Sequence, residues 1–309
     1  MTVRRLFLLV ALLLVATPVG VAQTQDTDSC FGARARDEFR PCHSSRLLRP
    51  VTPTPAEALL ESYPGCRAAG RIDVLYPCAF GPQAPSNSTG ELAIVGDSHA
   101  SHWRPAIDQI AARRNVQGMS LTRSGCPFSK AVARLRDPLK GQCIRWNQQV
   151  LEWFAQHPET RTVFISAHAN GQVINAPGKD AWQTQVDGYK DAWAALPPTV
   201  QQIFVLRDVP RSTLTMGQCI TKALVRHLLP GIVCATQKSK VLKPDPQIDA
   251  AKASGGRVKL IDLTNFFCGD RFCFPVIGRV LVHKDGDHMT QTFARTLAPY
   301  LMKAIGETR

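Results

Sequence analysis

From residue 91 onward, short apolar runs alternate with longer amphipathic segments. The short runs are four to six residues long and rich in apolar and β-branched residues, which is typical of strands buried on both faces. The strands that this pattern predicts are residues 92–95, 118–122, 162–166, 202–206 and 258–263.

The longer segments place apolar residues three or four positions apart, as one face of a helix requires. The last of them carries Phe293, Leu297, Leu301 and Ile305 at a spacing of four. Strands and helices in alternation predict an α/β fold, with a parallel sheet of roughly five strands covered on both faces. The helices that we expect are residues 103–114, 144–156, 181–195, 246–254 and 291–305.

The N-terminus has the pattern of a secretory signal peptide. Arg4 and Arg5 precede an apolar run over residues 6–16, and small residues follow up to Ala22. An uncleaved anchor is the alternative, but the run of about 11 residues is shorter than the roughly 20 that span a bilayer. We therefore expect cleavage after Ala22, no later membrane span, and a periplasmic or secreted product.

Ten cysteines follow this leader, which suits an oxidising compartment. No Cys-x-x-Cys motif occurs, so a zinc-thiolate site is not favoured. The cysteines fall into sequence-local pairs, which we take as the disulfide hypothesis. The expected bonds join Cys30 with Cys42, Cys66 with Cys78, Cys126 with Cys143, Cys219 with Cys234, and Cys268 with Cys273.

Residues 23–90 differ from the remainder of the chain. They contain four of the cysteines, several prolines and only weak periodicity, and they end in a loop-like stretch at 81–90. We expect a small disulfide-stapled extension and linker here, and a catalytic domain over residues 91–309.

The formal charge is +13, or +11 once Arg4 and Arg5 are removed. Such an excess suits anionic partners, such as an acidic polysaccharide or a lipid headgroup surface, although a solvated surface explains it equally well. No run of five like charges occurs and aromatic residues are sparse, so nucleic-acid binding is not expected.

Two short motifs carry candidate chemistry. Ser98 lies in Gly-Asp-Ser-His-Ala after the first expected strand, and Asp285 and His288 lie in Asp-Gly-Asp-His before the last helix. A serine becomes a nucleophile when a base removes its proton and a third group orients that base. We expect Ser98 as nucleophile, His288 as base and Asp285 as orienter. Asp287 competes for the last role, but a group adjacent to the histidine in a turn tends to diverge from it.

Each motif also has a structural explanation. Ser98 can be the N-cap of the helix that follows it, and His288 can be a surface residue near the last helix. The two motifs, together with the Ser-Gly-Cys-Pro block around Gly125, resemble the SGNH hydrolase superfamily. The closest resemblance is to the SGNH domain fused to membrane acyltransferase-3 domains in bacterial polysaccharide O-acetylation proteins. It covers about residues 91–306 and implies a flavodoxin-like three-layer α/β/α core.

The resemblance also implies roles for individual residues. Ser98, Asp285 and His288 match the triad, and the amides of Ser98 and Gly125 match oxyanion-hole donors. The third block of the superfamily contributes an asparagine, for which Asn170 is the candidate, although its register departs from the usual Gly-x-Asn-Asp. No metal or organic cofactor is expected.

The functions that follow are hydrolysis of an acyl ester, or transfer of an acyl group, with acetyl transfer to a cell-envelope or secreted glycan favoured. As a standalone module, the chain would act alone or receive the acyl group from a separate membrane acyltransferase. A non-catalytic carbohydrate-binding or scaffold protein with the same fold is the alternative.

A metallohydrolase is a further rival. His99 and His102, three residues apart, do not form a familiar ligand signature. The side chains that such a site would use are His99, His102, His283, Asp285, Asp287 and His288.

Overall fold

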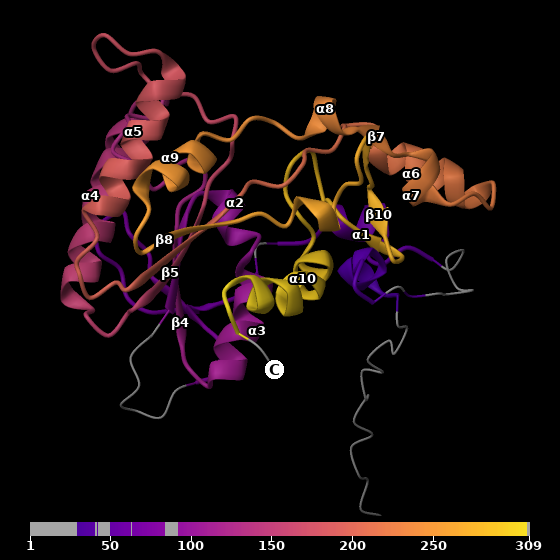
Figure 1. Ribbon diagram of the computed structural model, residues 1–309, viewed down its shortest axis with the longest axis horizontal. Helices are drawn as coiled ribbons and strands as arrows, with labels where there is room; N and C mark the ends of the chain where they lie inside the picture. The colour runs from indigo at the N-terminus through magenta and orange to yellow at the C-terminus, as the bar shows by residue number, and fades with distance from the viewer. Residues whose placement is uncertain (1–29, 41, 43–49, 63, 84–91, 308–309) are drawn as a thin grey trace, which may run out of the picture.

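The computed structural model describes residues 30–40, 42, 50–62, 64–83 and 92–307. These residues form an α/β fold in which helices cover both faces of a mostly parallel central sheet (Figure 1). The expected signal peptide at 1–22 and the expected linker residues 84–90 lie outside the described part of the chain.

The sheet has seven strands in the order β1-β2-β4-β3-β5-β6-β8. Its five parallel strands are the five that the hydrophobic pattern predicts, and their order is that of the flavodoxin-like fold. They are β3 (Leu92–Gly96), β4 (Gly118–Thr122), β5 (Thr162–Ser166), β6 (Gln202–Leu206) and β8 (Val258–Ile261).

The central strand β3 is buried along its whole length, because each of its faces meets a separate apolar core. Leu92 and Ile94 belong to one core and Ala93 and Val95 to the other, as the alternation of side chains along a strand requires. The helices over the first core are α3 (Arg104–Arg114) and α10 (Gln291–Ala304). The helices over the second are α4 (Leu139–Gln156), α5 (Ala181–Ala194) and α9 (Pro246–Ser254).

Two insertions interrupt the regular alternation and were not predicted. The first lies between β6 and α9 and comprises α6 (Met216–Val225), α7 (Pro230–Val233), β7 (Thr236–Gln237) and α8 (Lys238–Val241). The second lies between β8 and α10 and comprises η2 (Thr264–Phe266), β9 (Phe272–Cys273), β10 (Val276–Ile277) and β11 (Val280–Leu281). Most of their elements are too short for a hydrophobic period to reveal them, and α6, although it has 10 residues, was not recognised from the sequence.

The described part of the extension packs on the α/β core. It comprises η1 (Gly32–Arg36), α1 (Pro55–Leu59), β1 (Arg67–Ala68) and β2 (Cys78–Phe80). Strand β2 pairs antiparallel with β4 and so joins the main sheet. The amide of Thr52 donates to the carbonyl of Arg279 at 2.9 Å. The domain boundary at residue 90 stays a prediction, but the extension is built into the same body.

All ten cysteines are disulfide-bonded, in the nearest-neighbour scheme that the sequence predicts. Among the described residues, no helix has the length and apolar character needed to cross a membrane.

Candidate active site

Ser98 lies at a sharp turn between β3 and the short helix α2 (Ser98–Ser101). The turn depends on Gly96, whose φ of 144° is disfavoured for other residues. A Cβ at Gly96 would also lie 2.0 Å from the Ser166 carbonyl oxygen on the neighbouring strand. The sequence therefore places Ser98 half-buried at the carboxyl end of the central strand, where ligands bind in open α/β sheets.

Asp97 stabilises this turn by accepting hydrogen bonds from two backbone amides. Its buried carboxylate caps α2 by accepting from the His99 amide at 2.8 Å, and it accepts from the His168 amide at 2.9 Å. Burial raises the pKa of this carboxyl. Asp97 thus ties the segment of Ser98 to the loop that follows β5.

The predicted base and its orienter are hydrogen-bonded. His288 Nδ1 lies 2.9 Å from Asp285 Oδ2 and 3.1 Å from Oδ1. The Asp285 carboxylate also accepts from the backbone amides of Asp287 at 3.0 Å and His288 at 2.8 Å. The segment before α10 therefore folds around this single carboxylate.

These contacts set the protonation states of the pair. Burial alone would raise the pKa of Asp285, but the hydrogen bonds from His288 and from the two amides hold it well below its usual value. With Nδ1 bonded to an ionised carboxylate, neutral His288 carries its proton on Nδ1 and its lone pair on Nε2. That tautomer is the one a general base needs.

The Ser98 segment and the His288 segment meet across the carboxyl edge of the sheet. The rings of His99, the residue after Ser98, and His288 have centroids 5.0 Å apart. The His102 and His288 rings are 6.3 Å apart. The fold therefore brings together two motifs that are almost 190 residues apart in sequence.

Asp287 is shared among several groups. Its carboxylate lies 3.2 Å from His288 Nδ1, 3.6 Å from His168 Nε2 and 3.4 Å from Arg211 Nη2. It does not diverge from His288 as the sequence argument assumed. Asp285 is closer to the imidazole and has no such competing partners among the ion pairs of the described residues. We therefore keep Asp285 as the proposed orienter.

A second aspartate–histidine pair, formed by the residue that follows Ser98, was not predicted from the sequence. His99 Nδ1 lies 2.6 Å from Asp208 Oδ1, and both side chains are buried. The Asp208 carboxylate also accepts from the Ala169 amide at 2.8 Å. A buried polar residue at the carboxyl end of β6 was the available signal, since functional side chains gather at that edge.

His99 and Asp208 each favour the charged form of the other. Burial would lower the pKa of His99, but the charge and hydrogen bond of Asp208 outweigh it and raise the pKa to about 9. His99 in turn lowers the pKa of Asp208 against the effect of burial.

Two further imidazoles adjoin His99. The His168 ring stacks on it at 4.4 Å, and the His102 ring lies 5.1 Å away. Burial and the positive charge of His99 lower the pKa of His168, and they lower that of His102 well below its usual value. In this cluster a proton is therefore favoured on His99 over His168 and His102.

The expected oxyanion-hole residues lie at adjoining loops. Gly125 follows β4, next to β3 in the sheet, with a φ of 68°. Its loop is held by the Arg123 amide, which donates to the Gly96 carbonyl at 3.0 Å, and by the Cys126 disulfide. Asn170 is exposed in the turn after β5, where the neighbouring His168 and Ala169 make the contacts to the site. The oxyanion roles of Ser98, Gly125 and Asn170 stay predictions.

Most of the side chains that the metallohydrolase hypothesis would use lie close together in the structure. His283 stands apart from them, because its ring bonds the Pro210 carbonyl at 2.5 Å. In the others, Nδ1 of both His99 and His288 is already engaged by a carboxylate. The groups whose ligand-type atoms lie within 4.8 Å of one another are His99 with His102 and Asp208, His99 with His168 and Asp287, and Asp285 with Asp287 and His288.

Comparison with protein families gives one match, to the SGNH domain of the type fused to AT3 domains, over residues 65–303. The chain belongs to this SGNH family. The match begins within the predicted extension, so it includes the edge strands β1 and β2 as well as the parallel core.

Two solved structures are among those similar to this SGNH chain. The periplasmic domain of a lipopolysaccharide acetyltransferase from Salmonella ser. Paratyphi A is 13% identical with a TM-score of 0.53, covering 71% of this chain and 84% of its own. A candidate acylhydrolase from Bacteroides fragilis NCTC 9343 is 12% identical with a TM-score of 0.38, covering 73% and 90%. Comparison with curated protein sequences returned no match.

Proposed function

We propose that this protein is an exported serine enzyme that transfers an acetyl group to a glycan of the cell envelope or a secreted glycan through an acyl-enzyme on Ser98. The observation that carries the proposal is the hydrogen bond between His288 Nδ1 and Asp285, in a loop that faces the Ser98 turn. A non-catalytic binding protein has no need for a carboxylate that fixes one imidazole tautomer next to a serine.

In the proposed reaction, His288 Nε2 takes the proton of Ser98 Oγ while Oγ attacks the carbonyl carbon of the donor ester. The oxyanion forms at the amides of Ser98 and Gly125. Collapse breaks the ester bond, and the leaving alcohol takes the proton from His288. The Asp285 carboxylate stabilises the imidazolium that forms in each half of the reaction.

The acceptor in the second half of the reaction decides whether the enzyme is a transferase or an esterase. A glycan hydroxyl that gives its proton to His288 and attacks the acyl carbonyl yields an acetylated glycan, whereas water yields acetate. The glycan assignment is supported by the fold that this chain shares with a lipopolysaccharide acetyltransferase domain. The net charge of +11 that remains without Arg4 and Arg5 is compatible with an acidic glycan. A membrane acyltransferase is the donor that we propose.

The proposal is tested with exported protein and p-nitrophenyl acetate, with and without a panel of soluble glycans, and products are read by mass spectrometry. We expect nitrophenol release that Ser98→Ala abolishes and that is accompanied by glycan acetylation. Ser101→Ala, a buried serine of the same helix, is the matched control and keeps activity. Release that depends on Ser98 but leaves every glycan unmodified would make the protein an esterase. Release unaffected by Ser98→Ala, or none from the wild type, would overturn the proposal.

A further inference from the structure

The first insertion has an unusual charge pattern. Between Asp208 and Asp245 the chain has no acidic residue. It has six basic ones in that interval, which are Arg211, Lys222, Arg226, Lys238, Lys240 and Lys243. Arg211 is paired with Asp287 in the active site. Lys222 on α6 and Arg226 at its C-terminal end are exposed, and neither forms an ion pair with a carboxylate in the part of the chain that the structure describes.

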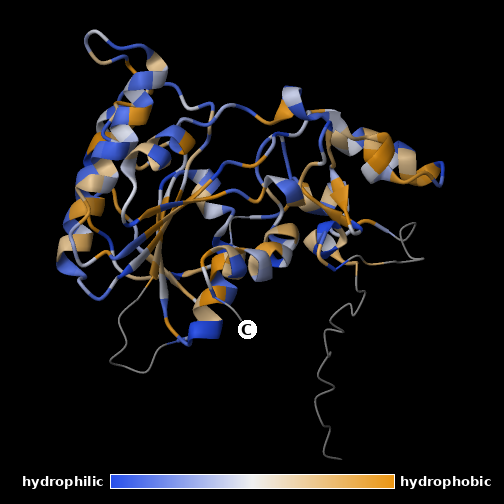
Figure 2. Cartoon of the chain, viewed as in Figure 1, coloured by the Kyte–Doolittle hydropathy of each residue, from blue (hydrophilic) through white to orange (hydrophobic). Residues whose placement is uncertain are grey.

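The same insertion exposes large apolar side chains. We define the α6–α7 hairpin as residues 214–234, and it projects away from the central sheet (Figure 1). Leu214 is 97% exposed, Val225 75%, Ile232 64% and Val233 51%. Leu228 and Leu229, in the turn between the helices, are exposed as well. Figure 2 shows apolar residues along this projecting hairpin beside hydrophilic ones.

This exposure does not come from loose packing. The inner face of the hairpin is buried through Ile220 and Ala223, which belong to a small apolar cluster with Leu281. The Cys219–Cys234 disulfide joins α6 to α7. The hairpin is thus a fixed element with a satisfied inner face, and the apolar residues on its outside have no partner within its own core cluster.

Exposed apolar side chains accompanied by basic ones fit the interface of an anionic membrane. There, apolar groups enter the boundary between headgroups and acyl chains, while Lys and Arg keep their charges at the phosphates. Large exposed apolar side chains gathered on one element of a folded protein are typical of an interaction site. We propose that the α6–α7 hairpin docks this protein on a bilayer that contains anionic lipids.

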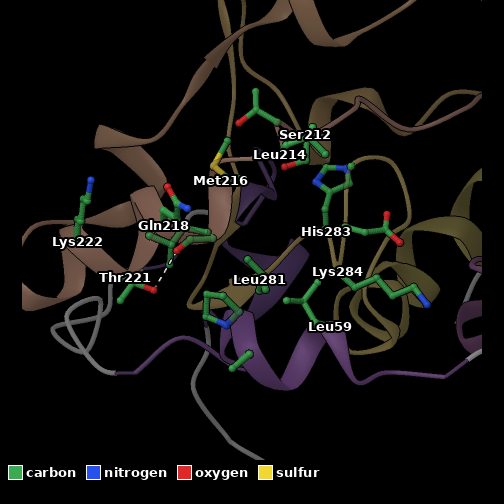
Figure 3. Close-up of a pocket in the computed structure, with 17 residues that line it drawn as sticks. Leu59, Ser212, Leu214, Met216, Gln218, Thr221, Lys222, Leu281, His283 and Lys284 are labelled. Carbon is green, nitrogen blue, oxygen red and sulfur yellow. Dashed lines mark hydrogen bonds between the residues drawn. The ribbon is translucent and has the colours of Figure 1, made fainter.

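The hairpin adjoins the loop of Asp285. A cavity of about 660 Å³ separates them, lined by Leu59 of α1, by Leu214 and Met216 at the start of α6, and by Lys284 and Asp285 (Figure 3). The hairpin therefore shares this cavity with the loop of Asp285. The docking itself does not depend on the catalytic assignment, so the two are tested separately.

The test is sedimentation of the exported protein with vesicles of phosphatidylethanolamine and phosphatidylglycerol, or of phosphatidylcholine alone. We expect binding to the anionic vesicles that weakens as salt rises, and little binding to phosphatidylcholine. Lys222→Gln with Arg226→Gln weakens binding roughly 25-fold, about fivefold for each charge. Ile232→Gln with Val233→Gln weakens it at least about tenfold. Circular dichroism and thermal melting check that each variant is folded.

Matched control pairs make the same chemical changes outside the hairpin. Lys252→Gln with Lys259→Gln removes two exposed charges on α9 and β8, and Leu139→Gln with Ile144→Gln changes two exposed apolar residues on α4. Both pairs keep wild-type binding if the hairpin is the docking surface. All variants share one N-terminus, so any contribution from that end cancels. Absence of binding to anionic vesicles, or equal losses in hairpin and control pairs, would overturn the proposal. Binding only to native membrane vesicles, lost after protease treatment, would assign the hairpin to a membrane protein instead.

Discussion

At the scale of single residues, the site contains two carboxylates within reach of one imidazole nitrogen. His288 Nδ1 lies 2.9 Å from Asp285 and 3.2 Å from Asp287. Asp285 is committed to His288 and to the amides around it, whereas Asp287 also faces His168 and Arg211. The distances to His288 therefore distinguish the two aspartates less clearly than their other hydrogen-bond and ion-pair partners do.

We expect Asp285→Asn to lower kcat by about 10³-fold or more, because the amide no longer holds the tautomer with the lone pair on Nε2. Asp287→Asn is the matched control, because it makes the same change two residues further along the chain. It should lower kcat by about tenfold at most. Steady-state kinetics with p-nitrophenyl acetate measures both. Equal losses would show that the two aspartates act as one unit, and a larger loss for Asp287→Asn would reverse the assignment.

The sequence was enough to predict the contact between Asp285 and His288, but not the contact of Asp287 with His288 or the histidine cluster next to Ser98. Asp285 and His288 belong to one short motif, so their contact is local. Asp208 and His99 are 109 residues apart, and His168 joins them only because β5 lies between β3 and β6 in the sheet. Contacts of this kind depend on strand order, which a single sequence does not contain.

At the scale of elements, the carboxyl ends of β3, β5 and β6 are joined by buried polar contacts. Asp97 after β3 binds the loop after β5, and Asp208 after β6 binds both that loop and His99. The predicted strands were right because their hydrophobic pattern alone defines them. Most elements of the two insertions are too short to carry such a pattern, and α6, which is long enough, was missed. The Cys219–Cys234 disulfide and packing on distant segments position the first insertion.

The His99–Asp208 pair makes stability depend on pH. The pKa of His99 is about 9 in the folded protein, above the roughly 6.5 of an unfolded chain. The pair therefore stabilises the fold fully below pH ~6.5, and this contribution is lost as pH rises through about 9. We expect Asp208→Asn to cost on the order of 3 kcal/mol near pH 6, because it leaves the His99 imidazole buried without its anionic partner.

Urea unfolding at pH 6, 7.5 and 9 measures this contribution. The difference in unfolding free energy between wild type and Asp208→Asn should shrink as pH increases. Other titrating groups are common to the two proteins, so they cancel in the difference. A difference that is constant with pH would contradict an ionised pair.

At the scale of the whole molecule, the N-terminal extension reaches the active site. The Glu61 carboxylate accepts a hydrogen bond from the Gln291 backbone amide at 3.0 Å. The backbone carbonyl of Glu61 accepts another from Lys284 Nζ at 3.0 Å. Lys284 and Gln291 flank the segment of Asp285 and His288. The sequence predicted the extension from its cysteines and prolines but gave no sign of this contact, which spans more than 220 residues.

We expect Glu61 to be a positioning residue for the catalytic loop. Glu61→Ala should lower kcat about tenfold with little change in KM, since it loosens the loop without touching substrate. Glu61→Gln, which keeps an acceptor oxygen, should restore most of the activity. Glu57→Ala removes one half of the capping box of the neighbouring α1 and serves as the control, with a small loss of stability and no change in kcat. Equal kinetic effects of Glu61→Ala and Glu57→Ala would contradict this role.

The central claim is that Ser98 becomes acylated. The most direct measurement is peptide mass spectrometry after brief exposure to a serine-directed fluorophosphonate or to an activated acetyl ester. Our account predicts a single adduct on Ser98 in the wild type, none in Ser98→Ala, strong reduction in Asp285→Asn, and turnover that a chelator leaves unchanged. An unlabelled Ser98 in a protein that still turns over esters, or turnover that a chelator abolishes, would contradict it.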